Sequence, residues 1–214
     1  MYKICIFFDY KNKWALKYFD KKIFKNNQKY KFFYHSNQKY LKNFDVVFLF
    51  GLTRIIKKKI ISNNKLVLVV HESNLPKGRG MNPVQNLILS NINRIPIKLI
   101  VASNLEVDSG DIILQDNFIL KSYDLIDEIR KKQFKATIKI MKSFLKKFPK
   151  YQLKKQKGKP TYFKRMTKSS NELNLNKTIK ENFNIIRISS KKYPAYFIFK
   201  KKKFYLNIYK KWII

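Results

Sequence analysis

The chain of 214 residues is predicted to be an α/β protein with a Rossmann-like, mostly parallel open sheet, helices on both faces and a small C-terminal helix–hairpin extension. Short apolar runs alternate with helix-like segments over about the first two thirds of the chain, a pattern typical of such sheets. The run Leu66–Val70 is aliphatic throughout, as in a strand buried on both faces in the middle of a parallel sheet. It stops at His71, at the strand end where open α/β sheets place their ligands.

The N-terminal part of the predicted sheet contributes three strands before this central run. Each is a short apolar run, and Trp14, Tyr18 and Phe19 recur at helical spacing between the first two strands. Gly51 ends the third strand, and Thr53 can cap a helix that follows it. The expected elements are a strand at Lys3–Phe8, a helix at about 12–25, and strands at Tyr30–Tyr34 and Asp45–Phe50.

The elements after the central run follow the same alternation. Pro83 suits the first position of a short helix, and an apolar stripe from Leu125 to Phe148 marks the longest helix, which Pro149 ends. The expected elements are a helix at Asn82–Ser90, strands at Ile95–Ala102 and about Ile112–Leu120, and a helix at Asp124–Phe148.

We expect three parts along the chain. Residues 1–149 form the main domain, and residues 150–175, which are rich in lysine, form an extended linker. Residues 176–214 form a small subdomain, with a helix at Asn176–Ile188 and a hairpin of Ala195–Phe199 and Phe204–Ile208 turned on Lys200–Lys203.

The net charge of +35 invites a nucleic-acid interpretation. Only 6 of the 48 basic residues are arginine, however, and arginine is the side chain that best reads bases and phosphates. The lysines are scattered over every segment and accompany many Asn, Ile, Phe and Tyr residues, all of which have A/T-rich codons. Compositional drift therefore accounts for much of the charge, and a dedicated nucleic-acid face remains the alternative.

Cysteine and histidine usage argues against a structural metal site. The single cysteine, Cys5, lies inside the first apolar run and suits a small core residue. There is no C-x-x-C pair, and there are two histidines, so no metal ligand set is expected. No apolar stretch approaches the length of a membrane helix, and the expectation is a cytoplasmic protein.

Two polar residues stand out as candidates for catalysis. His71 ends the central strand, and Asp108 lies in the turn Val107-Asp108-Ser109-Gly110-Asp111 before the next apolar run. We expect them on neighbouring strand ends and facing one pocket, close enough to interact directly or through one water. Each has an ordinary structural explanation by itself, as a hydrogen-bonded loop histidine and as a turn aspartate.

The same residues resemble the formyltransferase family that uses 10-formyltetrahydrofolate, whose pattern is Asn-x-His-x-Ser-x-Leu-Pro followed by Asp-x-Gly-Asp. The matching segments here are HESNLPKGRG, NPVQNLILSN and EVDSGDIILQ, and Pro160-Thr161-Tyr162-Phe163 resembles a later family segment. The resemblance implies that His71 and Asp108 are catalytic and that 10-formyltetrahydrofolate is the co-substrate. It implies cofactor contacts from Phe50, Gly51, Leu52, Leu75, Pro76, Leu105 and Val107, and substrate contacts from Ser73, Lys77, Arg79 and Asn82.

The chain departs from the family pattern at one position. The family Asn falls on Val69, which cannot donate a hydrogen bond to the oxyanion of the tetrahedral intermediate. Ser73, Asn74, Asn82 or loop amides can replace that donor, and Asn74 is the first candidate. Residues 69 and 71 of a strand point to the same face, so Val69 is expected beside His71.

Four functions follow from these observations. The first is N-formylation of a primary amine on a nucleotide-linked amino sugar, a small-molecule substrate. The second is formylation of methionyl-tRNA, which the charge favours, although the chain ends about 65 residues after the core and leaves little room for a tRNA-binding barrel. The third is a folate-binding homologue weakened by Val69, and the fourth is a nucleic-acid-binding module. A homodimer is compatible with each.

Overall fold

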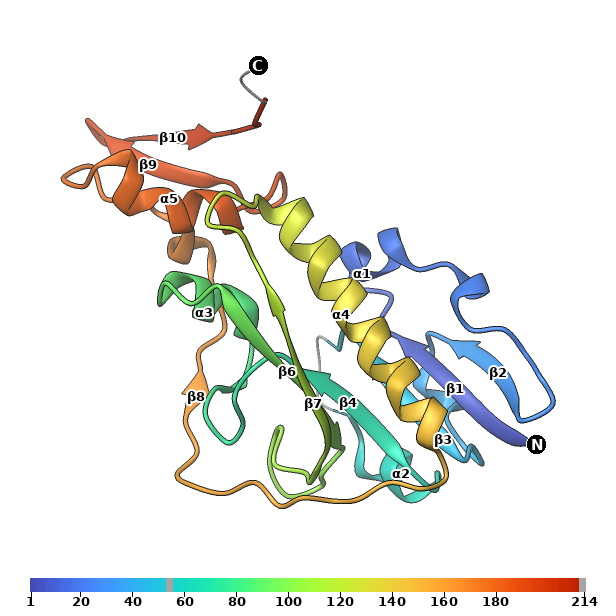
Figure 1. Cartoon of the computed structure of the whole chain (residues 1–214). Coiled ribbons are helices and arrows are strands. Elements are labelled where there is room, and N and C mark those ends of the chain that lie inside the picture. The colour runs from blue at the N-terminus through green and yellow to red at the C-terminus, as the bar shows by residue number, and fades with distance from the viewer. Residues whose placement is uncertain (53–55, 212–214) are drawn as a thin grey trace.

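A computed structural model describes residues 1–52 and 56–211; Thr53, expected to cap a helix, lies outside the described residues. Figure 1 shows one sheet crossed by the long helix α4 (Ile126–Lys147), with a separate hairpin near the C-terminus. The sheet has six strands in the order β2-β1-β3-β4-β6-β7. The strands are β1 (Tyr2–Phe8), β2 (Tyr30–His35), β3 (Val46–Phe50), β4 (Val67–His71), β6 (Arg94–Val101) and β7 (Ile112–Ile119).

The central strand is interior, as predicted, but only one of its neighbours is parallel. β4 pairs in parallel with β3 and antiparallel with β6, which in turn pairs antiparallel with β7. The cause is the position of α3 (Pro83–Leu89), which follows β4 without carrying the chain back along the sheet. The chain therefore starts β6 beyond the carboxyl end of β4 and runs back beside it, with His71 opposite Lys98.

The first predicted helix is broken into two short pieces. α1 (Lys13–Tyr18) ends where Phe19 becomes extended, and a 3₁₀ turn, η1 (Lys21–Ile23), follows. The Asp20 side chain accepts a hydrogen bond from the Lys22 amide and so starts that new turn. Phe19 packs on Phe8 with ring centroids 4.1 Å apart, so burial of its ring takes precedence over helix continuity.

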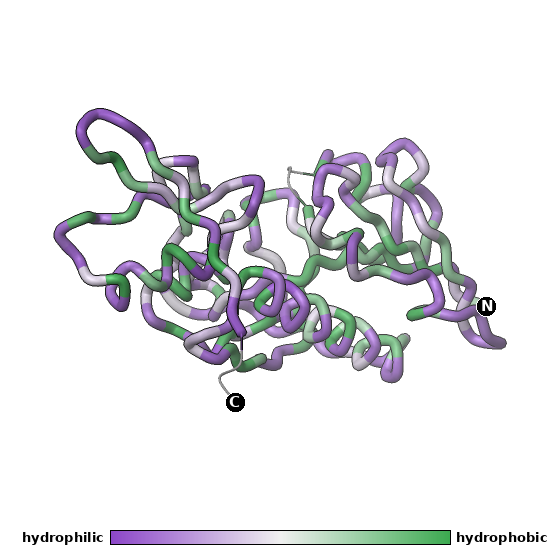
Figure 2. Tube along the Cα trace, turned by 90° about the horizontal axis from the view of Figure 1, so that it is seen from above, coloured by the Kyte–Doolittle hydropathy of each residue, from purple (hydrophilic) through white to green (hydrophobic). Residues whose placement is uncertain are grey.

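The sheet is covered on both faces. Alternate residues of β1, β3 and β4 pack under α4 with the aromatic side of α1, and the other alternate residues pack under α2 (Lys58–Ser62). Phe144 of α4 is fully buried, and its ring meets Phe48 of β3 edge-on at 5.8 Å. In Figure 2 the N-terminal strands run green and the surrounding loops purple, in line with this burial.

The expected linker is a structured strap. We use that name for residues 154–163, which run from Lys154, bridged to Ile112, to β8 (Tyr162–Phe163). β8 pairs in parallel with β5 (Arg79–Gly80), a short strand in the loop after His71. Gly78 fits against the Phe163 ring so closely that a Cβ would lie 2.4 Å from it. The strap thus runs alongside the loop after His71 and packs against it.

The C-terminal part contains α5 (Ile179–Ile188) and a hairpin of β9 (Ala195–Phe199) and β10 (Lys202–Leu206). The hairpin turns on two residues, Lys200 and Lys201, both with positive φ, so the predicted four-residue turn was wrong. Arg187 of α5 is buried and donates hydrogen bonds to the Lys121 carbonyl and the Asn93 side chain, which ties this part to the main domain.

No helix among residues 1–52 and 56–211 is long and apolar enough to cross a membrane.

We expect Phe144→Ala to lower the free energy of unfolding by about 3–5 kcal/mol, because it removes a fully buried ring and leaves a cavity. Chemical denaturation monitored by circular dichroism measures the change. Phe199→Ala is the matched control, because Phe199 is 53% exposed on the hairpin and its loss should change stability little. Equal losses for the two variants would contradict the assigned core.

Candidate active site

His71 is held in one orientation at the end of β4. The side chain is buried, and its Nε2 lies 2.8 Å from the Gly78 carbonyl oxygen. A carbonyl can only accept, so Nε2 carries a proton and Nδ1 is the nitrogen available for chemistry. The loop after β4 folds back so that its Gly78 carbonyl occupies the Nε2 donor.

Asp108 reaches His71 from an unexpected direction. Because β6 runs antiparallel to β4, the chain leaves β6 beside Val67, toward the far end of β4 from His71. The loop 102–111 turns back along the sheet, and Asp108 adopts a left-handed backbone conformation with φ 53°. Its Oδ2 lies 3.4 Å from His71 Nδ1 and accepts a hydrogen bond of 2.9 Å from the Gly80 amide. The predicted proximity of the two side chains is confirmed.

Two further polar groups are buried next to His71. Glu72 points to the α4 side of the sheet, where Gln133 donates a hydrogen bond of 2.7 Å to Oε1. Burial raises the pKa of the Glu72 carboxyl, and the Gln133 hydrogen bond opposes that rise only in part. Ser73 is 1% exposed, and its Oγ has no hydrogen-bond partner in the described part of the chain. A buried hydroxyl of this kind is open to a hydrogen bond from water or from a bound ligand.

The residues predicted to contact the cofactor separate into three groups. Gly51, with φ 62°, and Leu52 follow β3, and Leu52, like Val69 and Ala102, packs against the buried cluster on the His71 side of the sheet. Phe50 and Leu75 are core residues, and Pro76 is buried in the loop. Leu105 is 91% exposed and Val107 43% exposed, so both are available on the loop that carries Asp108.

The predicted substrate residues are also divided. Lys77 is exposed, whereas Arg79 is buried and already paired within the protein, with Nη1 2.7 Å from a Glu106 oxygen. The Asn82 side chain accepts a hydrogen bond from the Met166 amide. Asn74 is exposed and, with Lys77, lines a hollow of about 200 Å³ that also includes Lys157 and Lys159.

Val69 lies where the sequence predicted, two residues before His71 on the same face of β4. It is half-buried and packs against Leu75 and Ile100. An apolar side chain at this position keeps water from the face of the sheet that carries His71 but offers no hydrogen bond.

Sequence reasoning missed the polar groups that hold this site together. Gln156 of the strap binds both loops of the site, and Thr161 Oγ1 accepts a hydrogen bond of 2.9 Å from the Gly78 amide in the loop after β4. The buried Lys98, opposite His71, donates to the Leu75 carbonyl at 2.9 Å. The resemblance of Pro160–Phe163 to a family segment was the one signal that pointed to the strap.

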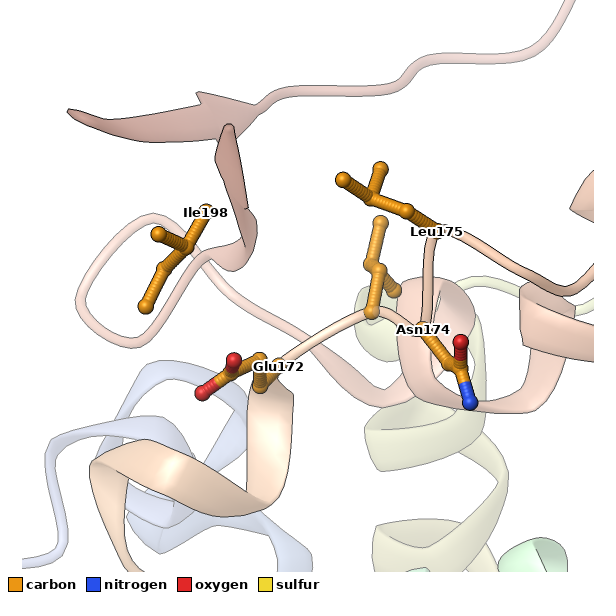
Figure 3. Close-up of a pocket in the computed structure, with 5 residues that line it drawn as sticks. Glu172, Asn174, Leu175 and Ile198 are labelled. Carbon is orange, nitrogen blue, oxygen red and sulfur yellow. The ribbon is translucent and has the colours of Figure 1, made fainter. Parts of the chain in front are cut away.

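A larger hollow, of about 350 Å³, lies in the C-terminal part and is distinct from the His71 site. Figure 3 shows the residues that line it, among them Glu172 and Leu175 from the segment before α5 and Ile198 of β9. Among the described residues no group of three or more His, Cys, Asp or Glu side chains could hold a metal ion.

Comparison with known proteins identifies the family. The model described as formyl transferase matches residues 9–145 of this chain. This chain belongs to the formyl transferase family. The match includes β3, β4, both loops of the site and most of α4, so it covers His71 and Asp108 but not the strap.

Relatives of the chain by sequence include the methionyl-tRNA formyltransferases of several bacteria. The methionyl-tRNA formyltransferase of Borreliella burgdorferi is 39% identical over 90 residues, which is 42% of this chain and 28% of that protein. The one from Sulfurihydrogenibium sp. is 29% identical over 154 residues, 68% of this chain and 48% of that protein. The chain thus matches about a quarter to a half of these relatives' lengths.

Solved structures share the fold over nearly the whole chain. Methionyl-tRNA formyltransferase from Clostridium thermocellum has a TM-score of 0.77 and 27% identity, covering 95% of this chain and 90% of that one. A 4-N formyltransferase from Francisella tularensis has a TM-score of 0.73 and 20% identity, covering 99% of both chains. HypX from Aquifex aeolicus in complex with tetrahydrofolic acid has a TM-score of 0.70 and 14% identity, covering 94% of this chain and 36% of that one.

We expect Glu72→Gln to make this formyl transferase more stable than the wild type at neutral pH. The folded-state pKa of Glu72 is raised, so its favourable contribution is complete below its ordinary pKa of 4.5 and is lost as the pH rises through the folded-state value. The glutamine removes that loss and can still hydrogen-bond Gln133. Unfolding free energies measured from acidic to neutral pH should converge at the acid end. A variant less stable at every pH would contradict this account.

Proposed function

We propose that this chain transfers a formyl group from 10-formyltetrahydrofolate to a primary amine. The observation that carries the proposal is the buried His71–Asp108 pair, with Nδ1 and Oδ2 3.4 Å apart at the end of an interior strand. Family membership supports the same reaction, and the complex of HypX with tetrahydrofolic acid shows a related fold holding a folate.

The residues around the pair fit a folate. The motif resemblance implies that Gly51 and Leu52 lie beside the pterin. Leu52, Val69 and Ala102 are partly buried apolar residues that pack against the core on the His71 side of the sheet. The buried Ser73 hydroxyl, which has no hydrogen-bond partner among the described residues, can supply a polar contact to the folate. Such a site, mostly apolar with a few fixed polar groups, is typical of small-molecule binding.

The protein's part in the reaction is to move a proton and to exclude water. Formyl transfer joins the amine nitrogen to the formyl carbon, breaks the bond from that carbon to N10, and moves one proton from the amine to N10. His71 Nδ1, when neutral, can take the proton from the attacking amine and return it to N10. Asp108 stabilises the imidazolium that forms in between, and the Gly78 carbonyl fixes the ring through Nε2.

For the acceptor we propose a nucleotide-linked amino sugar. Support comes from the hollow beside the loop after β4, where Lys77, Lys157 and Lys159 gather around Asn74. Three ammonium groups next to the catalytic loop suit the phosphates of a nucleotide. The 4-N formyltransferase of Francisella tularensis has the same fold over 99% of both chains, which is compatible with this acceptor.

Methionyl-tRNA is the second candidate acceptor. The relatives that match by sequence are named methionyl-tRNA formyltransferases, and the net charge of +35 on this chain suits a nucleic acid. The two acceptors predict different salt dependence. Binding of tRNA should weaken steeply with added salt as many phosphate contacts release counterions, and a nucleotide sugar should show a shallow dependence.

We expect His71→Gln and Asp108→Asn each to lower turnover with 10-formyltetrahydrofolate by ~10²–10⁴-fold, because each removes one member of the proton-transfer pair. The assay follows formylation of nucleotide-linked amino sugars and of methionyl-tRNA in parallel. His35→Gln is the matched control, since His35 lies at the end of β2 and stacks on Tyr40. Full activity of either site variant would refute the proposed roles.

We expect Val69→Asn to raise turnover by about 10²–10³-fold if the wild type lacks a donor for the oxyanion.

We propose that Asn74 supplies that donor instead, because its exposed amide can reorient when substrate binds. In that case Asn74→Ala lowers turnover by ~10²-fold and leaves folate affinity unchanged, and Val69→Asn restores part of the loss. Unchanged turnover in Asn74→Ala would reject Asn74 and leave the amides of loop 73–80.

A wild-type protein that binds the folate without transferring its formyl group, and that gains activity with Val69→Asn, would identify a weakened folate-binding homologue.

A further inference from the structure

One strap residue contacts both loops of the site. Gln156 Nε2 donates to the Asp108 carbonyl oxygen at 2.7 Å and to the Gly110 carbonyl oxygen at 2.9 Å. Its Oε1 accepts from Arg79, at 2.9 Å from Nη2 and 3.3 Å from Nε. The loop after β4 and the loop after β6 are thus joined through a single side chain.

The arrangement uses the full hydrogen-bonding capacity of an amide. A glutamine side chain has two N–H donors and an oxygen with two lone pairs, and here both donors and both lone pairs are engaged. A glutamate could accept from Arg79 but could not donate to the two carbonyls. No charged or apolar side chain offers the same pattern, so the contact is specific for an amide.

The contacts close a ring through the catalytic pair. Asp108 accepts from the Gly80 amide, the chain continues to Arg79, Arg79 donates to Gln156, and Gln156 donates back to the Asp108 backbone. Asp108 needs this support because its φ of 53° is unfavourable for a residue with a Cβ. Only glycine fits at position 110, since a Cβ there would lie 1.7 Å from the Val101 carbonyl oxygen.

We propose that Gln156 is a positioning residue that sets the Asp108 carboxylate against His71 Nδ1. The kinetic part of this inference rests on the proposed formyl transfer, and the structural part does not. Loss of Gln156 should not unfold the loops, because Arg79 keeps Glu106, the Gly78 amide keeps Thr161, and β5 stays paired with β8. The expected defect is therefore in alignment, to which proton transfer is sensitive.

The kinetic test compares Gln156→Ala and Gln156→Glu with Gln152→Ala and Gln152→Glu. Gln152 is an exposed glutamine just before the strap and controls for charge and for loss of the amide. Both Gln156 variants should lose about 10²-fold in kcat with little change in KM for 10-formyltetrahydrofolate, as expected for misalignment of a bound reactant pair. Both Gln152 variants should keep the wild-type kcat.

A second readout does not depend on activity. The chain has two histidines, so NMR of isotope-labelled histidine gives one signal set for His71 and one for His35. The Gln156 variants should shift the His71 ring signals and leave those of His35 and the thermal unfolding midpoint unchanged. Unchanged His71 signals together with unchanged kcat would overturn the inference, as would equal effects in the Gln152 variants.

The two proposals can fail separately. If the wild type forms no formylated product with either acceptor, the proposed function fails, and the NMR comparison alone decides the role of Gln156. His71 signals that shift in both Gln156 variants then support the inference, and unshifted signals reject it.

Discussion

The fixing of Asp108 against His71 is the constraint on which the rest of the site depends. His71 ends β4, whereas Asp108 lies on a loop that leaves the sheet at the opposite end, because β6 runs antiparallel to β4. Closing that gap requires a long loop, a left-handed aspartate and outside support for both. The strap supplies the support, with backbone pairing at Ile112 and along β5 and with the side chains of Gln156 and Thr161. Three segments distant in sequence thus make one rigid edge.

The parts of the fold that could be predicted were those set by local pattern. Continuous apolar runs gave β1, β3 and β4 to within about two residues, and the apolar stripe gave α4. The direction of β6 could not be predicted in this way, since an apolar run does not show whether its strand pairs parallel or antiparallel with its neighbour. The direction of β6 follows from the position of α3, which depends on tertiary packing.

The candidate site divides along the same line. His71 and Asp108 could be found because they sit in short motifs with turn residues around them. Gln156 could not, since it lies in a lysine-rich stretch without periodicity and its partners are 48 and 77 residues away. The partners of Arg79 could not be predicted either, since the resemblance implies a substrate contact while in the fold Glu106 and Gln156 bind its guanidinium. The sequence shows the type of each polar residue but not which other residue will form its hydrogen bond or ion pair in the fold.

The net charge attracts anions at long range and does not determine which substrate the site binds. With 48 basic and 13 acidic residues the chain has a positive field that attracts any anion, and a folate carboxylate, a nucleotide diphosphate and a tRNA are all anions. The field therefore raises the encounter rate for the donor and for both candidate acceptors alike. Many lysines also lie over neighbouring aromatic rings, such as Lys203 over Tyr196 at 4.1 Å, which gives them a local role without any partner. Discrimination between acceptors must come from short-range contacts, and the lysines beside Asn74 and the loop that carries Asp108 are where such contacts would form.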